Sequence, residues 1–391
     1  MRLLFVADGR SPIALNWISY FVETGHEVHL ASTYPCQPDL RLSSLEVIPV
    51  AFSGAAGLGA QPAPATGVGG VRRMLPVGLR TAIRQWLGPL SLSGAARRFI
   101  EVVARIQPDL VHAMRIPYEG MLAALGRVEG VPLLISVWGN DFTLHARSNP
   151  MMARYTRLAL RGASALHADC QRDIRLARKW GFEPGKPAVL LPGGGGVQLD
   201  LFYPAGGGES AANQPATVVN PRGFRAYVQN EAFFRAIPRV LDACPQARFA
   251  CPAMAGETQA LRWVEQLNVA AQVELLPRLT RQQMAELFRS SQVAVSPTTH
   301  DGTPNTLLEA MACGCFPVAG DIESLREWII PGQNGLLVDP RSPGALAQAI
   351  ITALSDAQLR LSAREQNTRL VAERADYRRV MPQAEAFYHQ L

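Results

Sequence analysis

The chain has 391 residues, of which 48% are hydrophobic and 18% are charged. This composition is typical of a globular protein and excludes a disordered chain, and the length allows two or three domains with substantial cores. No segment has the uninterrupted apolar length of a membrane-spanning helix. The net charge of +6 fits nucleic acid, an anionic membrane or a phosphorylated substrate as a partner, although a genomic bias towards arginine is the simpler explanation.

The first apolar run, Leu3–Ala7, is too short for a signal peptide and is followed at once by Asp8, so it predicts a buried strand. Six cysteines are scattered along the chain without the paired spacing of a metal site. We therefore expect a reducing, cytoplasmic location.

Short apolar runs alternate with longer helical patterns along the whole chain, which predicts an α/β fold with parallel sheets covered by helices. The predicted strands of the first half are Leu3–Ala7, Glu27–Ala31, Leu45–Val50, Leu110–His112, Leu133–Val137, Ala165–Ala168 and Val189–Pro192. Those of the second half are Thr217–Asn220, Arg248–Pro252, Val273–Leu276, Val293–Ser296, Phe316–Ala319 and Leu336–Val338. The predicted helices include Pro12–Thr24, Ala95–Ile106, Gly120–Arg127, Pro343–Ser355, Gln358–Ala372 and Tyr377–Leu391.

Glycine-rich stretches at Gly193–Gly196 and Ala205–Asn213 interrupt this alternation and predict a domain boundary. We expect a first domain over residues 1–195, a linker over 196–213 and a second domain over 214–374. Residues Ser53–Gly70 are rich in Gly, Ala and Pro and predict a long loop.

The most informative stretch is Asp301–Gly314, which predicts an acidic loop that runs into a helix. Thr303 is placed to cap this helix, Pro304 suits its first position, and Gly314 can end it in a left-handed turn.

The unpaired N–H groups at the start of this helix, on Asn305 and Thr306, would favour an anion such as a phosphate. Glu309 lies five residues beyond Pro304, roughly 7–8 Å from that end, where the ribose of a nucleotide would follow. The alternative is an ordinary capped helix with a half-exposed glutamate.

This segment resembles the donor-site signature of retaining glycosyltransferases of family four, in which two acids separated by seven residues flank a helix start. The first acid is Asp301 where the family usually has Glu, and the second is Glu309. The family pattern is also matched by three flanking segments, Val293–Pro297, Phe316–Ala319 and Asn334–Val338. The resemblance implies the GT-B fold, two Rossmann-like domains whose parallel sheets face across a cleft. It also implies a nucleotide-sugar donor, retention of anomeric configuration, and a last helix, at about residues 375–391, that packs back on the first domain.

Gly9 and Ser11 follow the first predicted strand and open a helix, which is where α/β proteins bind ligands. A single glycine argues against a dinucleotide. The family usually has paired glycines here, and this chain resembles a subset with a Ser-Pro helix start. The alternative is a plain strand-to-helix turn.

Trp138, Gly139 and Asp141 follow another apolar strand, where the family has a loop that lines the sugar pocket. Trp138 offers a face for stacking and Asp141 a carboxylate for a sugar hydroxyl, although a Trp at a strand end is more often simply buried. Trp138 replaces a frequent family histidine, for which His112 and His145 are candidate substitutes. A histidine like His112, at the end of an apolar strand, is more often a core residue.

Arg222 and Arg225 follow the first strand of the second half, where the family has an arginine and a lysine directed at the donor diphosphate. Guanidinium groups bind phosphate through parallel hydrogen bonds, so Arg225 can replace the lysine. The alternative for each is an ordinary surface arginine.

The expected donor site comprises Arg222, Arg225, Gly302, Thr303, Pro304, Asn305, Thr306 and Glu309, with Asp301, Asp141 and Arg222 as catalytic candidates. The expected acceptor pocket comprises Gly9, Ser11, His112, Trp138, Gly139 and Asp141. No Asp-x-Asp motif and no zinc-type cluster occurs in the sequence, so we expect no metal and no other cofactor. A donor phosphate oxygen is expected to take the acceptor proton, because no covalent nucleophile presents itself.

Val71–Leu87 interleaves basic and large apolar residues; a solvated helix is the simpler explanation, and peripheral contact with the inner face of an anionic membrane is the alternative. A glycan or lipid-linked acceptor in cell-surface polysaccharide or glycolipid synthesis is the common case for the family. The competing hypotheses are a non-hydrolysing nucleotide-sugar epimerase, a catalytically silent nucleotide-sugar-binding subunit and, least favoured, a nucleic-acid-binding protein. Nucleic acid is not expected as a partner, because no recognition element is evident.

Overall fold

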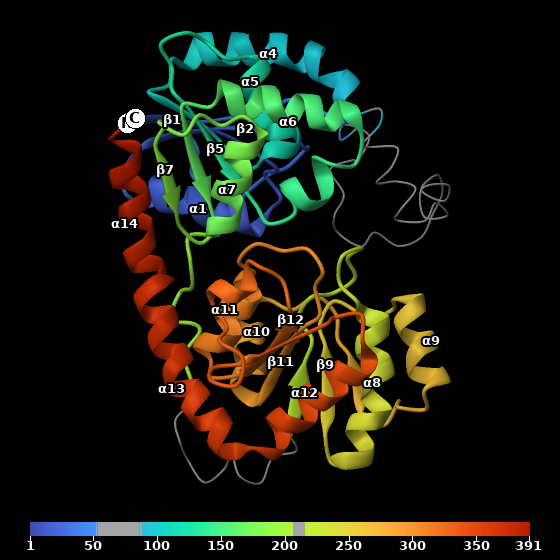
Figure 1. Cartoon of the computed structure of the whole chain (residues 1–391). Coiled ribbons are helices and arrows are strands. Elements are labelled where there is room, and N and C mark those ends of the chain that lie inside the picture. Colours follow the sequence, from blue (N-terminus) through green and yellow to red (C-terminus); the bar gives the residue numbers. More distant parts are fainter. Residues whose placement is uncertain (52, 54–85, 87, 206–215) are drawn as a thin grey trace. The chain divides into compact units, whose positions relative to one another are not determined.

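The computed structural model describes residues 1–51, 53, 86, 88–205 and 216–391. These residues divide into two compact units, residues 1–195 with 381–391 and residues 196–380 (Figure 1). Apart from Ser53 and Trp86, the loop expected at Ser53–Gly70 and the basic segment expected at Val71–Leu87 lie outside the described residues.

The first unit contains a seven-stranded parallel sheet in the order β3-β2-β1-β4-β5-β6-β7. Its strands are β1 Arg2–Ala7, β2 Glu27–Ser32, β3 Ser44–Val47, β4 Leu110–Ala113, β5 Leu133–Val137, β6 Ala165–Ala168 and β7 Ala188–Leu190. Five consecutive residues of β1, Leu3–Ala7, are at most 1% exposed, because helices cover both faces of the sheet. Strand order reverses between β1 and β4, and ligands bind α/β sheets beside such a reversal.

The helices of the first unit begin where their sequences favour a helix start. In α1, Pro12 is the first helical residue and the Ser11 hydroxyl accepts a hydrogen bond from the backbone N–H of Ala14. The other helices are α4 Leu92–Ile106, α5 Met121–Leu125, α6 Pro150–Gly162 and α7 Gln171–Trp180, and α1 is Pro12–Glu23. The short turns are η2 Gly88–Ser91, η3 Ile116–Gly120 and η4 Asp141–His145.

The second unit contains a six-stranded parallel sheet in the order β10-β9-β8-β11-β12-β13, with its reversal between β8 and β11. Its strands are β8 Thr217–Val219, β9 Arg248–Cys251, β10 Val273–Leu275, β11 Val293–Ser296, β12 Phe316–Gly320 and β13 Leu336–Val338. Its helical segments are α8 Asn230–Ala243, α9 Thr258–Gln266, α10 Arg281–Ser290, α11 Asn305–Ala312, η6 Leu325–Glu327, α12 Pro343–Ser355 and α13 Ala357–Arg374. The predicted α/β class with two parallel sheets is confirmed.

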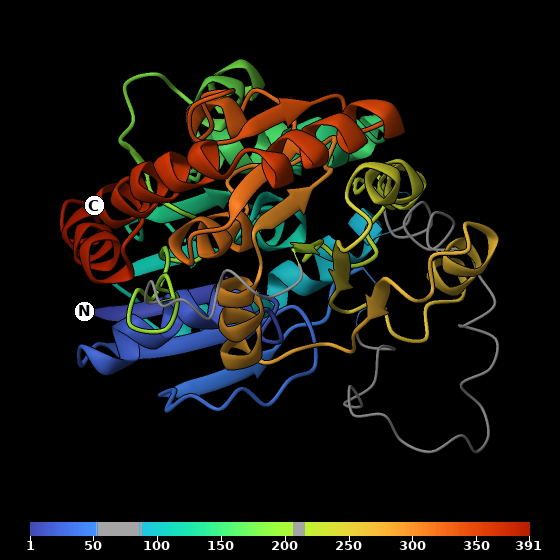
Figure 2. The same cartoon turned by 90° about the horizontal axis from the view of Figure 1, so that it is seen from below.

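The last helix, α14 Tyr377–Tyr388, begins in the second unit and ends in the first. In the second unit, Asp376 forms a β-bridge with Val197. In the first unit, the Tyr388 hydroxyl accepts a 2.8 Å hydrogen bond from the Trp17 indole, and the Tyr388 ring stacks on Phe21. Both chain ends lie at the same end of the first unit (Figures 1 and 2). No helix in the described part of the chain has the length and apolar character needed to cross a membrane.

Candidate functional site

The loop after β11 leads into α11, whose first helical residue is Asn305. The prediction that Thr303 caps this helix is wrong, because the Thr303 hydroxyl accepts a 3.0 Å hydrogen bond from the Trp328 indole and both groups are buried. Pro304, predicted at the first helical position, is instead the extended residue before the helix, with φ −69° and ψ 121°. Gly314 ends the helix in a left-handed conformation as predicted, with φ 90°.

The start of α11 therefore has no side-chain cap. The backbone N–H groups of Asn305 and Thr306 have no hydrogen-bond partner among the described residues. Such unpaired donors, together with the helix dipole, favour an anion at this point.

Three polar side chains meet beside this helix start. The Arg222 guanidinium forms an ion pair with the Asp301 carboxylate and donates a 2.9 Å hydrogen bond to the Thr306 hydroxyl. Arg222 is 6% exposed, and its Nε atom is buried without a partner in the described chain. The structure thus brings together the predicted arginine, the first acid and the helix start, and leaves the guanidinium with unused bonding capacity.

The two loops that carry this group are fixed to each other and to the sheet. Val228, after β8, pairs with Thr298, after β11, and the backbone N–H of Gln229 donates to Pro297. The Ser324 hydroxyl donates a 2.8 Å hydrogen bond to the backbone oxygen of Asp301. Because the backbone on both sides is held by hydrogen bonds, the Arg222–Asp301 pair is positioned by the fold and not by flexible loop ends.

Arg225 lies further out on the same loop and is exposed. Its guanidinium donates a 3.0 Å hydrogen bond to the Tyr227 hydroxyl. Desolvation opposes the charge of Arg225, but Tyr227 and Asp301 outweigh this effect and raise the pKa of the guanidinium. Arg225 is therefore a second cation within the electrostatic reach of Asp301.

Glu309 lies one turn into α11, about 6 Å along the axis from Asn305. Its side chain is 15% exposed, and the Arg281 guanidinium, 3.8 Å away, forms a loose ion pair with it. Burial raises the pKa of the Glu309 carboxyl to about 7, and Arg281 only partly opposes this rise. A buried carboxyl with so high a pKa is a feature of binding and catalytic sites.

The first unit contains a cavity of about 260 Å³ near the carboxyl ends of β1, β4 and β5. Of the residues predicted for the acceptor pocket, Ser11 and Trp138 line it. The complete lining consists of Asp8, Ser11, Ala14, Tyr34, Met114, Arg115, Pro117, Tyr118, Glu119, Trp138 and His145.

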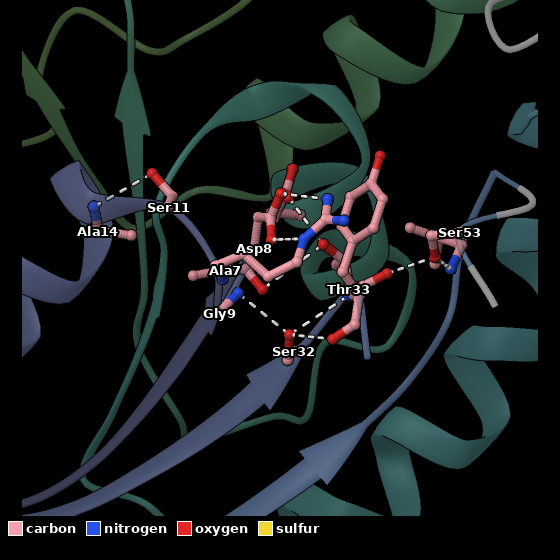
Figure 3. Close-up of polar contacts among 12 residues, drawn as sticks. Ala7, Asp8, Gly9, Ser11, Ala14, Ser32, Thr33 and Ser53 are labelled. Carbon is pink, nitrogen blue, oxygen red and sulfur yellow. Dashed lines mark hydrogen bonds and ion pairs between the residues drawn. The ribbon is translucent and has the colours of Figure 1, made fainter. Parts of the chain in front are cut away.

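The segments that follow β1 and β2 contribute Asp8, Ser11 and Tyr34 to the lining. Figure 3 shows polar contacts within and between these segments. The Asp8 carboxylate accepts two hydrogen bonds from the Arg10 guanidinium, each 2.9 Å long, and Arg10 lies over the Tyr34 ring at 3.6 Å. The backbone N–H of Gly9 donates a 3.1 Å hydrogen bond to the Ser32 hydroxyl. Gly9 does not line the cavity, because it packs closely against Ser32 and Cys36.

Asp141 does not line the cavity and its side chain is fully buried. Its carboxylate accepts hydrogen bonds from Arg115 (2.8 Å) and from the backbone N–H groups of Ile116 and Trp138 (3.2 Å each). The Asp141 carboxylate thus points into the protein and away from the cavity. Its hydrogen bonds hold Arg115 and Trp138 in place, and both of these residues line the cavity.

Gly139 and His112 also lie away from the cavity lining. The Gly139 carbonyl accepts a 2.7 Å hydrogen bond from Arg172. His112 is 1% exposed and hydrogen-bonded to Tyr388 and, at 2.7 Å, to Ser136, so the structure places it in the core. Burial lowers the pKa of His112 well below its usual value, and His167 adds to this effect.

A strained turn forms another part of the cavity wall. Tyr118 has φ 71° and ψ −53°, although it is bulky and buried. Such a conformation costs about 1–3 kcal/mol and is concentrated at functional sites. Here it lets the chain reverse after Pro117 and brings Glu119 to the cavity, where Glu119 accepts a 2.9 Å hydrogen bond from Thr33.

The side chains of Asp169, Cys170 and Asp173 lie close enough together to hold a metal ion. However, Arg172 already donates hydrogen bonds of 2.9 and 3.1 Å to the Asp173 carboxylate. Burial raises the pKa of the Cys170 thiol far above its usual value. This group therefore resembles a buried ion pair more than a metal site.

Two family models together match most of the chain. The model for glycosyl transferase 4-like domains matches residues 9–193, and the model for glycosyl transferases group 1 matches residues 224–356. The chain belongs to the group 1 glycosyltransferases. The predicted family is thereby confirmed.

Curated relatives of this chain are similar over part of their length. One is a D-inositol 3-phosphate glycosyltransferase of Geodermatophilus obscurus, 29% identical over 215 residues, which are 50% of this chain and 47% of the relative. A protein of the same name from Paenarthrobacter aurescens is 32% identical over 114 residues, 29% of this chain and 27% of the relative. The chain thus spans about half the length, or less, of the curated relatives it matches.

Solved structures support the GT-B fold over the whole chain. A sucrose-phosphate synthase from Thermosynechococcus elongatus has a TM-score of 0.76 and 17% identity, and the match covers 100% of this chain and 99% of the synthase. HepE from Anabaena, in complex with UDP, has a TM-score of 0.73 and 16% identity, with 100% of both chains covered. Because these identities are low, the likeness establishes the fold alone.

Proposed function

We propose that the chain transfers a sugar from a nucleotide-sugar donor to an acceptor hydroxyl, with retention of configuration. One observation carries the proposal: Arg222, Asp301 and the uncapped start of α11 meet at the switch point of the second sheet, with Glu309 one turn further on. This arrangement offers a cation, unpaired N–H donors and a carboxyl in the order that a diphosphate and its ribose require.

The diphosphate would lie at the start of α11, hydrogen-bonded to the N–H groups of Asn305 and Thr306. Arg222 and Arg225 would neutralise its charge, and Glu309 would accept hydrogen bonds from the ribose. Asp301 and the backbone of Gly302–Asn305 would hold the sugar. Structures of HepE from Anabaena, which is similar in fold, contain UDP or UDP-glucose. A uridine nucleotide is therefore the first donor to test.

In the transfer, the bond from the anomeric carbon to the diphosphate oxygen breaks and the electron pair leaves with the nucleoside diphosphate. A bond from the same carbon to the acceptor oxygen forms on the same face, and the acceptor proton passes to a diphosphate oxygen. Arg222, Arg225 and the helix start stabilise the negative charge that develops on the leaving group. These side chains can supply this stabilisation without a metal ion.

The acceptor would bind in the cavity of the first unit, lined by Ser11, Trp138 and the residues around Tyr118. A cytoplasmic protein that acts at the inner face of the membrane, in the synthesis of a cell-surface polysaccharide or glycolipid, fits this function. The acceptor would then be a glycan or a lipid-linked sugar.

A screen of nucleotide sugars by thermal stabilisation tests the proposal, because a bound ligand raises native stability by RT ln(1 + [L]/Kd). We expect one nucleotide sugar to raise the Tm of the wild type and not of Arg222→Ala. Arg235→Ala, which removes an exposed arginine from α8, is the control and should behave as wild type.

Product analysis then separates transfer from the other activities. Release of nucleoside diphosphate together with a glycosylated acceptor supports the transferase. Conversion of the donor without any acceptor would indicate an epimerase, and binding without turnover on a broad acceptor panel would indicate a silent subunit.

A further inference from the structure

We infer that the cavity of the first unit binds an uncharged sugar or polyol ring and discriminates against a phosphorylated acceptor. This inference rests on the proposed function, because it names the class of acceptor that the transferase would use. The evidence for it is that the arginines around the cavity form ion pairs with carboxylates of the same unit.

The guanidinium groups beside the cavity already hold carboxylates. Arg10 forms two parallel hydrogen bonds of 2.9 Å to Asp8, the geometry in which an arginine would otherwise hold a phosphate. Arg115 donates to the Asp141 carboxylate at 2.8 Å and to the Asn140 side chain at 3.2 Å. A phosphate that bound the Nε–Nη2 edge of Arg10 or the Nη2 group of Arg115 would therefore have to displace the carboxylate already held there.

The carboxyl groups of the lining, in contrast, suit the hydroxyls of a neutral ring. The Asp8 side chain is 28% exposed and lines the cavity together with Glu119. Figure 3 shows Asp8 and Thr33 at the ends of neighbouring strands, and Thr33 donates to Glu119 at 2.9 Å. Carboxylates accept hydrogen bonds from sugar hydroxyls, whereas the same groups repel an anion and so exclude the wrong partner.

The remaining lining fits a single ring. Tyr34 and Trp138 provide aromatic surface for the apolar face of a sugar, and Ser11 adds a hydroxyl. The volume of about 260 Å³ lies just below the range of about 300–1,000 Å³ that is usual for ligand pockets. One sugar or cyclitol ring is therefore the appropriate occupant.

Matched pairs of neutral and phosphorylated ligands test this inference on the full chain. The pairs are glucose with glucose 6-phosphate and myo-inositol with inositol 1-phosphate, and binding is followed by saturation-transfer NMR and calorimetry. We expect the neutral member of at least one pair to bind about tenfold more tightly than its phosphate. Asp8→Asn releases Arg10 and should shift the preference towards the phosphate by about tenfold, the scale of one charged hydrogen bond.

Asp200→Asn is the matched control, because it breaks an exposed carboxylate–arginine pair with Arg378 in the other unit. It should leave the preference unchanged. The inference is overturned if the wild type prefers the phosphate, if no neutral ring binds up to its solubility, or if Asp8→Asn leaves the preference as it was. Nucleotide-sugar binding is measured in the same samples: its absence would refute the proposed function, whereas its presence with a phosphate-preferring cavity would refute only this inference.

Discussion

Glu309→Gln is expected to stabilise the folded protein at pH 8 and to weaken donor binding. The carboxyl has an ordinary pKa of 4.5, and burial raises it to about 7. At about 1.4 kcal/mol for each tenfold change in proton affinity, this rise means that the ionised Glu309 destabilises the fold by about 3 kcal/mol. Glutamine keeps the shape of the side chain and removes this charge.

The pH dependence follows from the direction of the shift. Between pH 4.5 and about 7, the folded chain binds a proton at Glu309 that the unfolded chain has lost, so wild-type stability falls as the pH rises through this window. The wild type and Glu309→Gln should therefore be nearly equal in stability at pH 4. They should differ by about 3 kcal/mol at pH 8, with the variant more stable.

Urea unfolding of both proteins at pH 4 and pH 8, followed by circular dichroism, measures this difference. Glu373→Gln, at an exposed glutamate on α13, controls for the loss of one negative charge. In the same samples, Glu309→Gln should bind the nucleotide sugar about 10–100-fold less tightly, since it loses a charged hydrogen-bond acceptor. A variant that is less stable than the wild type at pH 8 would refute the argument from burial.

Three further substitutions test other parts of the structure. Arg222→Lys should lower kcat/KM for the donor by at least about tenfold, because an ammonium lacks the planar fork with which the guanidinium holds Thr306 and Asp301 and still offers an N–H to a phosphate; steady-state kinetics with an unchanged value would contradict the assignment. Tyr388→Phe should destabilise the protein by about 2 kcal/mol in urea unfolding, because the buried Trp17 indole loses its hydrogen-bond acceptor. Gly196→Ala should cost more than about 2 kcal/mol, because φ is 92° and the added methyl would meet the Ala375 carbonyl. Gly185→Ala, with open space around it, should be nearly neutral in the same assay.

Much of the fold could be predicted because its strands carry a strong local signal. Leu133–Val137, Ala165–Ala168, Val293–Ser296 and Leu336–Val338 have the predicted bounds, since each is a short apolar run between polar or turn-forming residues. Leu45–Val50 was less well predicted. Its strand is Ser44–Val47, because the later residues leave the sheet.

The hydrogen bonds and the ion pair of the candidate donor site join residues that are distant in sequence, so the sequence alone could not predict them. Thr303 has a typical capping sequence around it, but the Trp328 indole, 25 residues later, engages its hydroxyl. A residue pattern cannot anticipate such a competing donor, so the cap was wrong although the helix itself was right. The ion pair of Arg222 with Asp301 likewise joins residues 79 positions apart.

The first-unit cavity was the least predictable part. Trp138 and Asp141 share one loop, yet only Trp138 lines the cavity, because three hydrogen bonds to Arg115 and to two backbone N–H groups direct the Asp141 carboxylate inwards. Tyr34 and Glu119 come from separate loops that the sheet order brings together. Nothing in the sequence Pro117-Tyr-Glu119 predicts the positive φ of Tyr118, since neither glycine nor asparagine occurs there.

The ion pair between Arg222 and Asp301 has a consequence for how tightly any anion can be held there. A diphosphate bound to the part of the guanidinium that faces Asp301 would compete with that carboxylate, whereas one bound at Nε would leave the ion pair in place. If the proposed function holds, this competition would lower the affinity for the nucleoside diphosphate product, because Asp301 could pair with the arginine again as the product leaves. The same contact that orders the Arg222 guanidinium beside the start of α11 would then speed product release.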